Sequence, residues 1–446
     1  MPLGRACSID DSGCIGAIVP RATPSNGNSP VAARLGPGVT ATATTTERPH
    51  IEGPSLSPRR VAAAIAALSV GSFAIGTTEF VTMGLLPEMA DSVSVSIPAA
   101  GHVISAYALG VVVGAPVIAI FGARLPRRAL IIALMVAFAV ANVTSALAQD
   151  YLQLAVARFA SGVPHGAYFG LASLVAASLV PAARRGRAVS LVMLGLPVAT
   201  VLGVPLGTWM GQNLGWRMTY GAVALVAVVT VALVLAVVPS TPGDPHATGR
   251  RELRAFREPQ VWLTLLVGAV GFGGMFAMYS YIAPTVTEVT GQPRGMIPFF
   301  LLAFGVGAVA GTIAGGRLAD WSVLRALVAS GTAMGVGLAI FSFTSAALWP
   351  GLLTVFFVSA AGGVLTINLQ LRLMHVAGDA RTIGAALNHS SLNIANALGA
   401  WLGGLVIAAG WGYTATSWVG VALSAAGLLL LAWSVLLHRR DVAVTS

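Results

Sequence analysis

Three ionisable side chains interrupt apolar stretches in which a charge is costly, and they are the residues best suited to chemistry. Glu79 lies within GTTEFVTMGLL, and Arg158 and His165 lie within RFASGVPHGAYFG. A charge at the centre of a membrane helix costs roughly 2.5–3.5 kcal/mol on insertion scales, so such residues face the protein interior or water. A carboxylate or an imidazole there can take up and release protons. These residues therefore indicate proton exchange or ion pairing inside a membrane.

The composition is that of a protein that crosses a membrane many times. Of the 446 residues, 56% are hydrophobic and only 9% are charged, whereas soluble domains are about 25% charged. The formal net charge is +10 and every one of the 25 basic residues is Arg. The Arg residues are scattered between apolar runs and form no concentrated basic face of the kind that binds nucleic acid. We expect a lipid bilayer, and no nucleic acid, as a partner.

Several chemistries are excluded by residues that the chain lacks. Cys7 and Cys14 are the only cysteines, and they provide neither a disulfide framework nor a metal cluster. A Walker-type phosphate loop requires Lys, which is absent, so ATP is not expected as the energy source. No metal-ligand cluster or nucleophile constellation is visible. We expect no cofactor and no enzymatic activity.

The apolar runs predict an all-α membrane protein with twelve transmembrane helices in two six-helix halves. The predicted spans are 61–86, 99–121, 129–148, 152–180, 189–213, 218–238, 260–286, 298–315, 326–345, 351–376, 383–409 and 415–437. Residues 1–58 are rich in Pro, Gly, Ser and Thr, and we expect a disordered tail or a start codon assigned too early. The remaining segments are an N-terminal half (59–238), a cytoplasmic linker (239–259), a C-terminal half (260–440) and a cytoplasmic tail (441–446).

The distribution of Arg predicts the orientation. If the residues before the first span are cytoplasmic, eighteen Arg residues fall on the inner side and only Arg217 and Arg294 on the outer side. Four more lie in the N-terminal tail, and Arg158 lies within a span. This asymmetry supports an even number of spans in the cell membrane, with both termini in the cytoplasm.

A weak internal repeat supports two similar halves. GARLPRR at position 122 is echoed by GGRLADW at 315, GVPLG at 203 by GAWLG at 399, and Gly215-Trp216 by Gly410-Trp411. The three offsets are 193, 196 and 195 residues. Matches at nearly one offset indicate a duplicated six-span unit.

Together these features resemble the major facilitator superfamily. GTTEFVTMGLLPEMA, RFASGVPHGAYFG and VLGVPLGTWMGQNLGWRMTY are similar to segments of the bacterial twelve-span drug:proton antiporters of the arabinose-efflux-permease type. The resemblance covers about residues 59–440. It implies the major facilitator fold, a site at the midplane that opens to either side in turn, and a small-molecule substrate exchanged for protons.

The resemblance also implies gating segments on the cytoplasmic side. The family pattern after span 2 is Gly-x-Leu-Ala-Asp followed by basic residues, but here Pro126 stands where Asp is usual. The copy in the second half keeps its acidic residue, Asp320. The residues implied to act in these gating loops are Arg124, Arg127, Arg128, Gly316, Arg317 and Asp320.

Span 5 departs from the family's adjacent Gly-Pro, because Val204 separates the two residues. The antiporter-type residues here are Gly195, Gly203, Pro205 and Gly207. Small residues permit close helix contact and Pro bends a helix. We expect either a bendable interface between the halves or ordinary helix packing.

Polar residues in the second half are candidates for a substrate cavity. His389, Asn393 and Asn396 follow the spacing i, i+4, i+7 and form one stripe of a helix that should not face lipid. Such a stripe either contacts substrate or hydrogen-bonds to another helix. The same two interpretations hold for Tyr279, Tyr281 and Asn368.

Glu79 and Arg158 are predicted to lie at matching depth. Glu79 is about 10 Å below the outer end of its span and Arg158 about 9 Å below, at 1.5 Å per residue. In the family, the first and fourth helices of each half line a central cavity, which would bring the two side chains together. They form either a static ion pair or a site where Glu79 exchanges a proton. His165 lies on the same face as Arg158 and is either a satisfied hydrogen-bonding group or a proton relay.

We therefore predict a proton-coupled exporter of small molecules, drugs or metabolites, that acts as a monomer. Its partners are the substrate, protons and the bilayer. A sugar or nucleoside exporter or importer on the same fold is the first alternative. A non-transporting membrane receptor is an alternative of another class.

Overall fold

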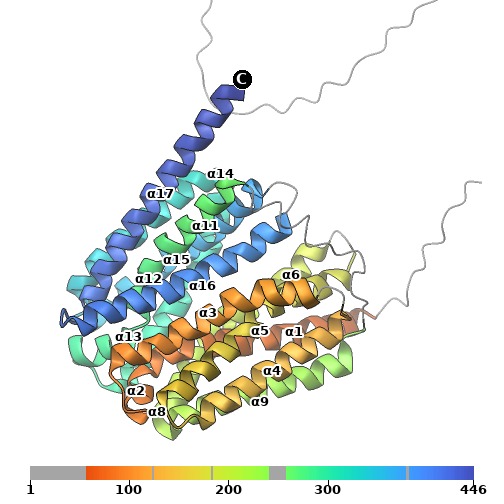
Figure 1. Ribbon diagram of the computed structural model, residues 1–446, viewed down its shortest axis with the longest axis horizontal. Helices are drawn as coiled ribbons and strands as arrows, with labels where there is room; N and C mark the ends of the chain where they lie inside the picture. The colour runs from red at the N-terminus through yellow and green to blue at the C-terminus, as the bar shows by residue number, and fades with distance from the viewer. Residues whose placement is uncertain (1–56, 123–124, 182–183, 241–257, 378–380, 446) are drawn as a thin grey trace, which may run out of the picture. The chain divides into compact units, whose positions relative to one another are not determined.

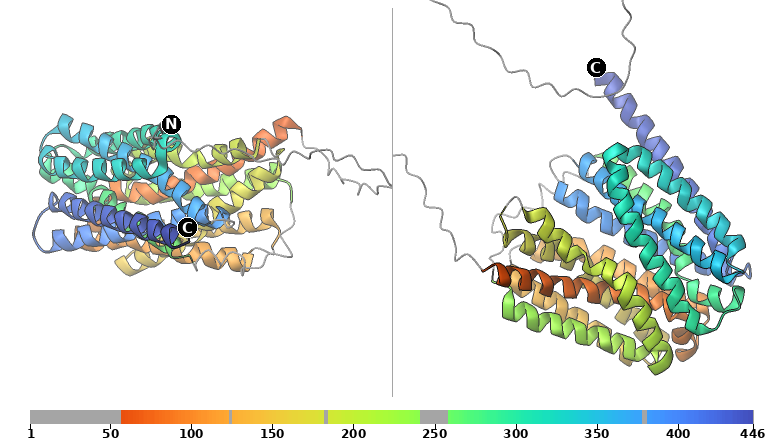
Figure 2. Two further views of the ribbon diagram at one scale, coloured as in Figure 1. Left: turned by 90° about the horizontal axis from the view of Figure 1, so that it is seen from above. Right: turned by 180° about the vertical axis from the view of Figure 1, so that it is seen from behind.

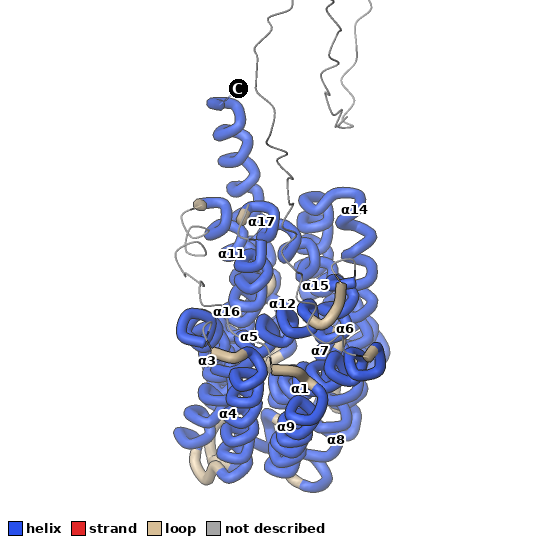
Figure 3. Tube along the Cα trace, turned by 90° about the vertical axis from the view of Figure 1, so that its right-hand side faces the viewer, coloured by secondary structure: helices blue, strands red, loops and turns tan. Residues whose placement is uncertain are grey.

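The computed structural model describes residues 57–122, 125–181, 184–240, 258–377 and 381–445. The predicted N-terminal tail, most of the linker and the gating residue Arg124 lie outside these ranges. Within them all regular structure is helical (Figure 3). Ten stretches are long and apolar enough to cross a membrane. One of the ten, Arg294–Thr344, is long enough to contain two spans. The helix of residues 151–178 is a further span, which Arg158 and His165 make less apolar than the others. The twelve-span prediction is therefore confirmed.

The helix bounds agree with the predicted spans to within a few residues at most ends. The first half comprises α1 (Pro58–Gly84), α2 (Leu86–Ser92), α3 (Ile97–Gly122), α4 (Arg127–Leu147), α5 (Tyr151–Ser178), α6 (Arg185–Met193), α7 (Gly195–Val198), η2 (Ala199–Gly203), α8 (Val204–Leu214) and α9 (Trp216–Val237). The second half comprises α11 (Pro259–Gly271), α12 (Gly273–Tyr279), α13 (Ile282–Pro284), η4 (Thr285–Val289), η5 (Arg294–Met296), α14 (Ile297–Thr344), α15 (Leu348–Val376), α16 (Arg381–Ala408) and α17 (Ala415–Thr445).

The long helix α14 corrects one prediction. The sequence predicted a loop between spans 8 and 9 that contains the gating motif, but helix continues beyond residue 315. The two spans meet at Ser322, whose backbone is extended (φ −173°, ψ 118°). Gly316, Arg317 and Asp320 therefore lie on the last helical turns of a span instead of in a loop.

The two halves repeat the same close helix contact. A Cβ atom at Gly110 of α3 would lie 2.1 Å from the carbonyl oxygen of Phe159 in α5. A Cβ atom at Gly307 of α14 would lie 2.3 Å from the carbonyl oxygen of Phe356 in α15. Both second-half residues follow their counterparts by 197 positions. Backbones this close tolerate only Gly, so the predicted duplication is a repeat of packing as well as of sequence.

The halves lie beside each other and share part of their core. In Figure 1, α1 to α9 form one group of helices and α11 to α17 the other, and Figure 2 shows the same division from behind. α3 packs against α16, and η2 and α8 pack against α14. The largest buried cluster includes Phe80 and Ile104 of the first half together with Tyr279 and Phe304 of the second. The interface between the halves is therefore largely apolar and aromatic.

Span 5 contains a π-helical turn. In η2 the chain closes a wide turn in which the Val204 N–H donates to the Ala199 carbonyl five residues earlier. Such turns occur mostly as single insertions within α-helices and often at functional positions. A second π-helical segment, η4, follows Pro284 in span 7. Two spans thus contain a π-helical turn, one between Pro197 and Pro205 in span 5 and one after Pro284 in span 7. The bendable interface at span 5 stays a prediction.

Large apolar side chains cover much of the outer surface of the helices. Phe121, Phe343 and Leu429 are 77%, 74% and 73% exposed. Contiguous exposed apolar surface is unfavourable in water and marks contact with lipid or protein. This surface supports the prediction of a membrane protein.

Candidate functional site

Glu79 is buried in α1 at the place where the first half meets the second. Its side chain is 6% exposed, and it forms no hydrogen bond or ion pair with any residue that the structure describes. The next residue, Phe80, stacks on Phe276 of α12 with ring centroids 6.4 Å apart and meets Tyr279 edge-on at 6.2 Å. Glu79 is therefore a carboxylate beside an aromatic contact between the halves.

Arg158 of α5 is fully buried and contacts the residue next to Glu79 instead of Glu79 itself. Its Nη2 donates to the Thr78 carbonyl oxygen at 3.0 Å, and its Nη1 donates to Thr78 Oγ1 at 3.2 Å and Ser161 Oγ at 3.4 Å. The guanidinium carbon lies 4.4 Å from the ring centroid of Tyr107 and 5.2 Å from that of Tyr220. Charge-assisted hydrogen bonds and cation–π contacts hold the cation in place without a carboxylate.

Thr78 extends this network to α4. Its hydroxyl donates to Asn142 Oδ1 at 2.7 Å while accepting from Arg158. The Asn142 amide in turn donates to the Phe138 carbonyl oxygen at 2.8 Å. One buried set of hydrogen bonds thus connects α1, α4 and α5 and fixes the position of the cation.

His165 is joined to the same network through Tyr107 of α3. The Tyr107 hydroxyl lies 2.9 Å from His165 Nδ1, whereas His165 Nε2 has no hydrogen-bond partner among the described residues. If the tyrosine donates, the neutral imidazole carries its proton on Nε2. The His165 ring also lies 5.2 Å from the ring of Phe169, which stacks on His389 of α16 at 5.6 Å. His165 thus lies one aromatic ring away from the second half.

Of the polar stripe on α16, two amides are buried with unused hydrogen-bonding capacity. Asn393 donates to the His389 carbonyl oxygen at 3.0 Å, but its Oδ1 has no partner in the described chain. Asn396 is fully buried, and neither its oxygen nor its nitrogen has a described partner. Buried amides are normally satisfied, so these atoms suit a polar ligand or water.

The other candidate cavity residues have structural contacts. Asn368 is fully buried and donates to the carbonyl oxygens of Val364 and Gly315, at 2.9 and 3.3 Å, which connects α15 to α14. The Tyr281 hydroxyl donates to the Ala400 carbonyl oxygen at 2.7 Å. The ring of Tyr279 stacks on Phe304 at 3.7 Å. Tyr281 thus serves helix packing, and Tyr279 belongs to the aromatic contact near Glu79. Asn368 connects α15 to α14 through its amide nitrogen, and its Oδ1 has no partner in the described chain.

The residues of span 5 face α1 within their own half. A Cβ atom at Gly203 would lie 2.2 Å from Thr77 Oγ1, and one at Gly195 would lie 2.3 Å from the Ser69 carbonyl oxygen. Gly207 and Pro205 continue in α8. One contact with the second half is made by the Thr200 carbonyl, near Gly305 of α14. Span 5 thus combines close packing within its half with a separate contact across the interface.

The described gating residues lie on helices at the predicted cytoplasmic end, where Arg127 and Arg128 are half-buried and Gly316 is exposed. Arg127 and Arg128 form the first turn of α4, and the Arg128 guanidinium donates to the Leu235 carbonyl oxygen of α9. Arg317 and Asp320 are exposed on α14, and Asp320 forms no ion pair with any described residue. The structure shows no closed contact at these positions within its described residues.

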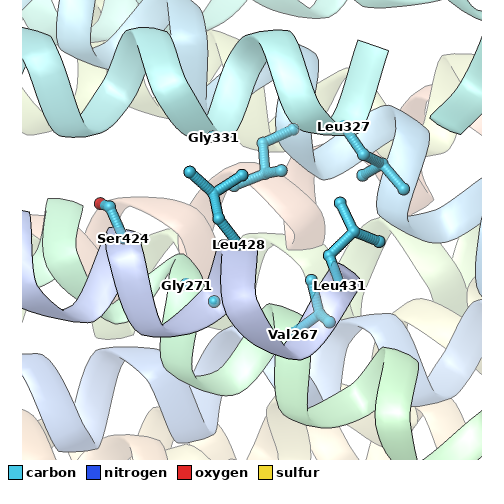
Figure 4. Close-up of a pocket in the computed structure, with 9 residues that line it drawn as sticks. Val267, Gly271, Leu327, Gly331, Ser424, Leu428 and Leu431 are labelled. Atoms are coloured by element: carbon cyan, nitrogen blue, oxygen red, sulfur yellow. The ribbon is translucent and has the colours of Figure 1, made fainter. Parts of the chain in front are cut away.

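A small pocket lies elsewhere, within the second half (Figure 4). Its lining is apolar except for Ser424. It is formed by α11, α14, α15 and α17 and contains none of the predicted site residues. The lining residues are Val267, Gly271, Leu327, Gly331, Leu365, Ser424, Gly427, Leu428 and Leu431.

Sequence reasoning missed five members of the polar network: Thr78, Tyr107, Asn142, Ser161 and Tyr220. Asn142 interrupts the apolar run FAVANVTSAL, and Tyr107 interrupts the run ISAYALGVVV. A polar side chain within an apolar run pointed to Glu79, and the same signal is present at Asn142 and Tyr107 but is weaker because neither side chain is charged. Thr78 gave no signal, because a Thr in a membrane helix can satisfy its hydroxyl on its own backbone.

The fold and this buried polar interior define a class of protein, a multi-span membrane transporter. A family model described as Major Facilitator Superfamily matches residues 68–388. The chain belongs to the major facilitator superfamily, as its sequence motifs indicated. It is therefore a membrane transporter of small molecules and not an enzyme.

Several relatives align over most of the chain. The inner membrane transport protein YdhP of Escherichia coli (strain K12) is 38% identical over 85% of this chain and 98% of its own length. The putative transporter AraJ of the same organism is 34% identical over 84% and 94%. A chloramphenicol resistance protein of Streptomyces lividans is 33% identical over 81% and 94%.

Solved structures share the fold at low identity. The crystal structure of a D-xylose-proton symporter superposes with a TM-score of 0.67 at 17% identity, covering 83% of this chain and 97% of that one. A bacterial homologue of the lysosomal transporter Spinster, inward-facing and unoccupied, gives 0.62 at 17% identity, covering 85% and 96%. These two structures support the fold alone.

Proposed function

We propose that this protein exports small, largely apolar molecules from the cytoplasm in exchange for protons, and that Glu79 carries the proton. The observation that supports this most is the buried Glu79 carboxylate, which has no ion pair or hydrogen bond in the described chain while a cation is held beside it by Thr78. A purely structural ion pair would place the two charges in contact. A carboxylate left free beside a fixed cation can instead gain and lose a proton without dismantling the network.

The proposed cycle alternates exposure of the midplane between the two sides. Protonation of Glu79 from the outside accompanies release of substrate there, and deprotonation toward the cytoplasm prepares the carrier for the next substrate. The Arg distribution supports an orientation with both termini in the cytoplasm. We propose in addition that the chain acts as a monomer. His165, joined to Arg158 through Tyr107, is the second group able to hold a proton in the same network.

The surroundings favour an aromatic substrate of low charge. Phe80, Phe276, Tyr279 and Phe304 form a continuous aromatic contact next to Glu79. Asn396 adds a buried amide with free donor and acceptor atoms. Aromatic surfaces with a few polar groups suit small apolar ligands that need orientation. The relative named as a chloramphenicol resistance protein supports neutral aromatic antibiotics as a substrate class.

Transport by purified protein tests this assignment. We would reconstitute the full chain in liposomes with an internal pH dye and impose a proton gradient, with chloramphenicol, a lipophilic cation, xylose and a nucleoside as test solutes. Proton movement that depends on chloramphenicol or the cation supports the proposal. Transport of xylose or the nucleoside alone would establish the alternative of a sugar or nucleoside carrier. Binding without any flux would indicate a receptor.

The variant Glu79→Gln tests the role of the carboxylate. Gln has nearly the volume of a protonated Glu, so we expect normal abundance and retained substrate binding. We expect gradient-driven transport to fall by about 100-fold or more, because a group that cannot ionise cannot couple. Glu258→Gln is the matched control, since Glu258 is exposed at the start of α11.

The coupled proton flux decides between the two interpretations of Glu79. Undiminished proton flux per substrate in Glu79→Gln would move the coupling site to His165. Lower abundance with normal coupling in the protein that remains would make Glu79 a structural residue. Loss of coupling in Glu258→Gln as well would show that the assay does not isolate the buried carboxylate.

A further inference from the structure

Arg294 bridges the two halves at the end of the bundle opposite the gating motifs. It belongs to η5 of the second half, and its Nη1 lies 3.6 Å from Glu88 Oε1 on α2 of the first half. Its Nη2 lies 3.9 Å from Asp91 Oδ2 on the same helix. The Gln212 amide of α8 also donates to the Arg294 carbonyl oxygen at 3.1 Å. In the predicted orientation this is the outer end, and the halves are in contact there.

The two carboxylates differ in their surroundings. The side chain of Glu88 is only 13% exposed, whereas that of Asp91 is 75% exposed and that of Arg294 is 58% exposed. Neither carboxylate oxygen of Glu88 accepts a hydrogen bond from another described residue. An exposed pair such as Arg294–Asp91 contributes little. A buried carboxylate without hydrogen bonds depends on its countercharge, and Arg294 is the cation that supplies it.

We propose that Arg294 is the latch of the outer gate: it supplies the countercharge that allows Glu88 to remain buried while the halves are closed at this end. The proposal rests on the alternating access of the proposed function. When the halves separate here, Glu88 enters water and no longer needs Arg294. The closed halves therefore need the Arg294 cation only as long as Glu88 carries a charge. If both residues are replaced by neutral ones, closure no longer depends on a charge at position 294.

The charges around Glu88 determine the sign of the pH effect. Burial raises the pKa of Glu88, its own backbone N–H and then the Arg294 cation oppose that rise, and Asp91 adds to it. Arg217 of α9 binds Ser92 at the end of α2, and His102 of α3 contacts Tyr151 instead. A raised pKa in the closed state, against an ordinary pKa in water, means that falling pH favours closure. Ionised Glu88 thus opposes closure, and Arg294 offsets this opposition.

Distances between spin labels at the outer ends of the halves test the latch without knowledge of the substrate. The full chain, with Cys7 and Cys14 changed to Ser, would carry labels at Gln149→Cys and Trp349→Cys, two exposed positions in opposite halves. Double electron–electron resonance would compare the latch variants Arg294→Gln and Glu88→Gln, their combination and the exposed control Asp91→Asn.

The proposal predicts a pattern among the four variants. Arg294→Gln should raise the separated population about tenfold near neutral pH, because Glu88 is left buried without its countercharge. Glu88→Gln and the double variant should remain as closed as the parent, and Asp91→Asn should match the parent. Lowering the pH should reverse the opening in Arg294→Gln, since protonated Glu88 needs no countercharge.

Three results would overturn the latch: no opening in Arg294→Gln, opening in Glu88→Gln equal to that in Arg294→Gln, or no rescue in the double variant. A second label pair, at Leu125→Cys and Trp321→Cys, reports the opposite end of the halves. Closure of this inner pair as the outer pair opens supports the latch within an alternating cycle. If the outer pair behaves as predicted while the inner pair stays unchanged, the latch stands and the alternating cycle of the proposed function fails.

Discussion

The two halves use one packing scheme for different chemistry. A shift of 197 positions, the shift that superposes the glycine contacts of α3 and α5 on those of α14 and α15, also pairs the polar residues of the first half with residues of the second. The pairs are Glu79 with Phe276, Tyr107 with Phe304, Arg158 with Val355 and His165 with Gly362. Every ionisable group of the first-half network is thus replaced by an aromatic, an aliphatic or no side chain.

We infer from this difference that the first half holds the buried charges and that the second half supplies the apolar contact surface. Burying a cation requires partners, and the first half supplies hydrogen bonds and aromatic faces to Arg158 from its own helices. Only Arg158 Nε has no hydrogen-bond partner in the described chain. The second half presents aromatic rings and the amides of α16 to the same region. Apolar contacts can slide or separate at small cost in hydrogen bonds. We infer that the second half can move against the first without disturbing the charged network.

The largest expected effect, on stability, comes from replacing Arg158 by the residue that stands at the paired position of the second half. Arg158→Val copies the residue at the paired position and removes both hydrogen bonds that Arg158 donates to Thr78. We expect the stability of the purified protein to fall by about 3–5 kcal/mol, because one member of a buried charged network is lost. Membrane abundance and thermal unfolding in detergent measure this.

Arg158→Lys serves as the intermediate variant, since Lys keeps the charge but lacks the fork that reaches both oxygen atoms of Thr78. Wild-type stability in Arg158→Val would mean that the network contributes nothing to folding.

A smaller effect is expected from Tyr107→Phe, which again copies the second half. The variant keeps the ring beside Arg158 and loses only the hydrogen bond to His165 Nδ1. We expect near-normal abundance, a loss of about 1 kcal/mol in stability and a transport rate up to about tenfold lower. The pH profile of transport should also change, because the tautomer of His165 is no longer fixed.

The reverse change in the second half, Phe304→Tyr, is the matched control for Tyr107→Phe. Gly362 stands at the position paired with His165, so the added hydroxyl meets no imidazole. Equal changes of the pH profile in both variants would show that the hydrogen bond to His165 is irrelevant.

The smallest expected effect concerns the gating motif, which is complete only in the second half. Asp320 is exposed and forms no ion pair in the described chain. At the offset of 193 residues its counterpart in the first half is Arg127, which follows Pro126. We expect Asp320→Asn to lower transport by up to about fivefold with normal abundance, the effect of roughly 1 kcal/mol that an exposed charge pair provides when the inner gate closes. Transport rates beside those of Glu258→Gln test this. A rate equal to that of the parent would reduce the motif to a remnant.

The sequence was sufficient for the spans but not for the partners of the buried charges. Long apolar runs and one-sided Arg residues fix where helices cross a membrane, because the bilayer imposes both. The sequence does not indicate, in contrast, that Arg158 contacts Thr78 and not Glu79. Adjacent residues on a helix point about 100° apart, and a long side chain can reach either one. Only the packing of α1 against α4 and α5 selects between them.

The end of the helix in span 8 and the contact between α14 and α15 could not be predicted from the sequence either. The apolar pattern ends near residue 315, yet α14 remains helical until Ser322, since charged residues such as Arg317 and Asp320 are compatible with an exposed helical turn. Asn368 was selected as a polar residue in a span, and its actual bond to the Gly315 carbonyl depends on how closely α15 approaches α14. Both outcomes depend on tertiary contacts that no local pattern encodes.

The π-helical turn of span 5 determines how the chain tolerates a change in its length. Such a turn holds one residue more than an α-helical turn, and each residue of an α-helix rotates the chain by about 100°. Deleting one residue between Ala199 and Gly203 would restore a regular helix and rotate α8 by that angle. Gly211, which lies against Leu85, would leave its contact, and Trp209, now 57% exposed, would turn away from its present surroundings. A single deletion in this turn would therefore present a different face of α8 to the neighbouring helices.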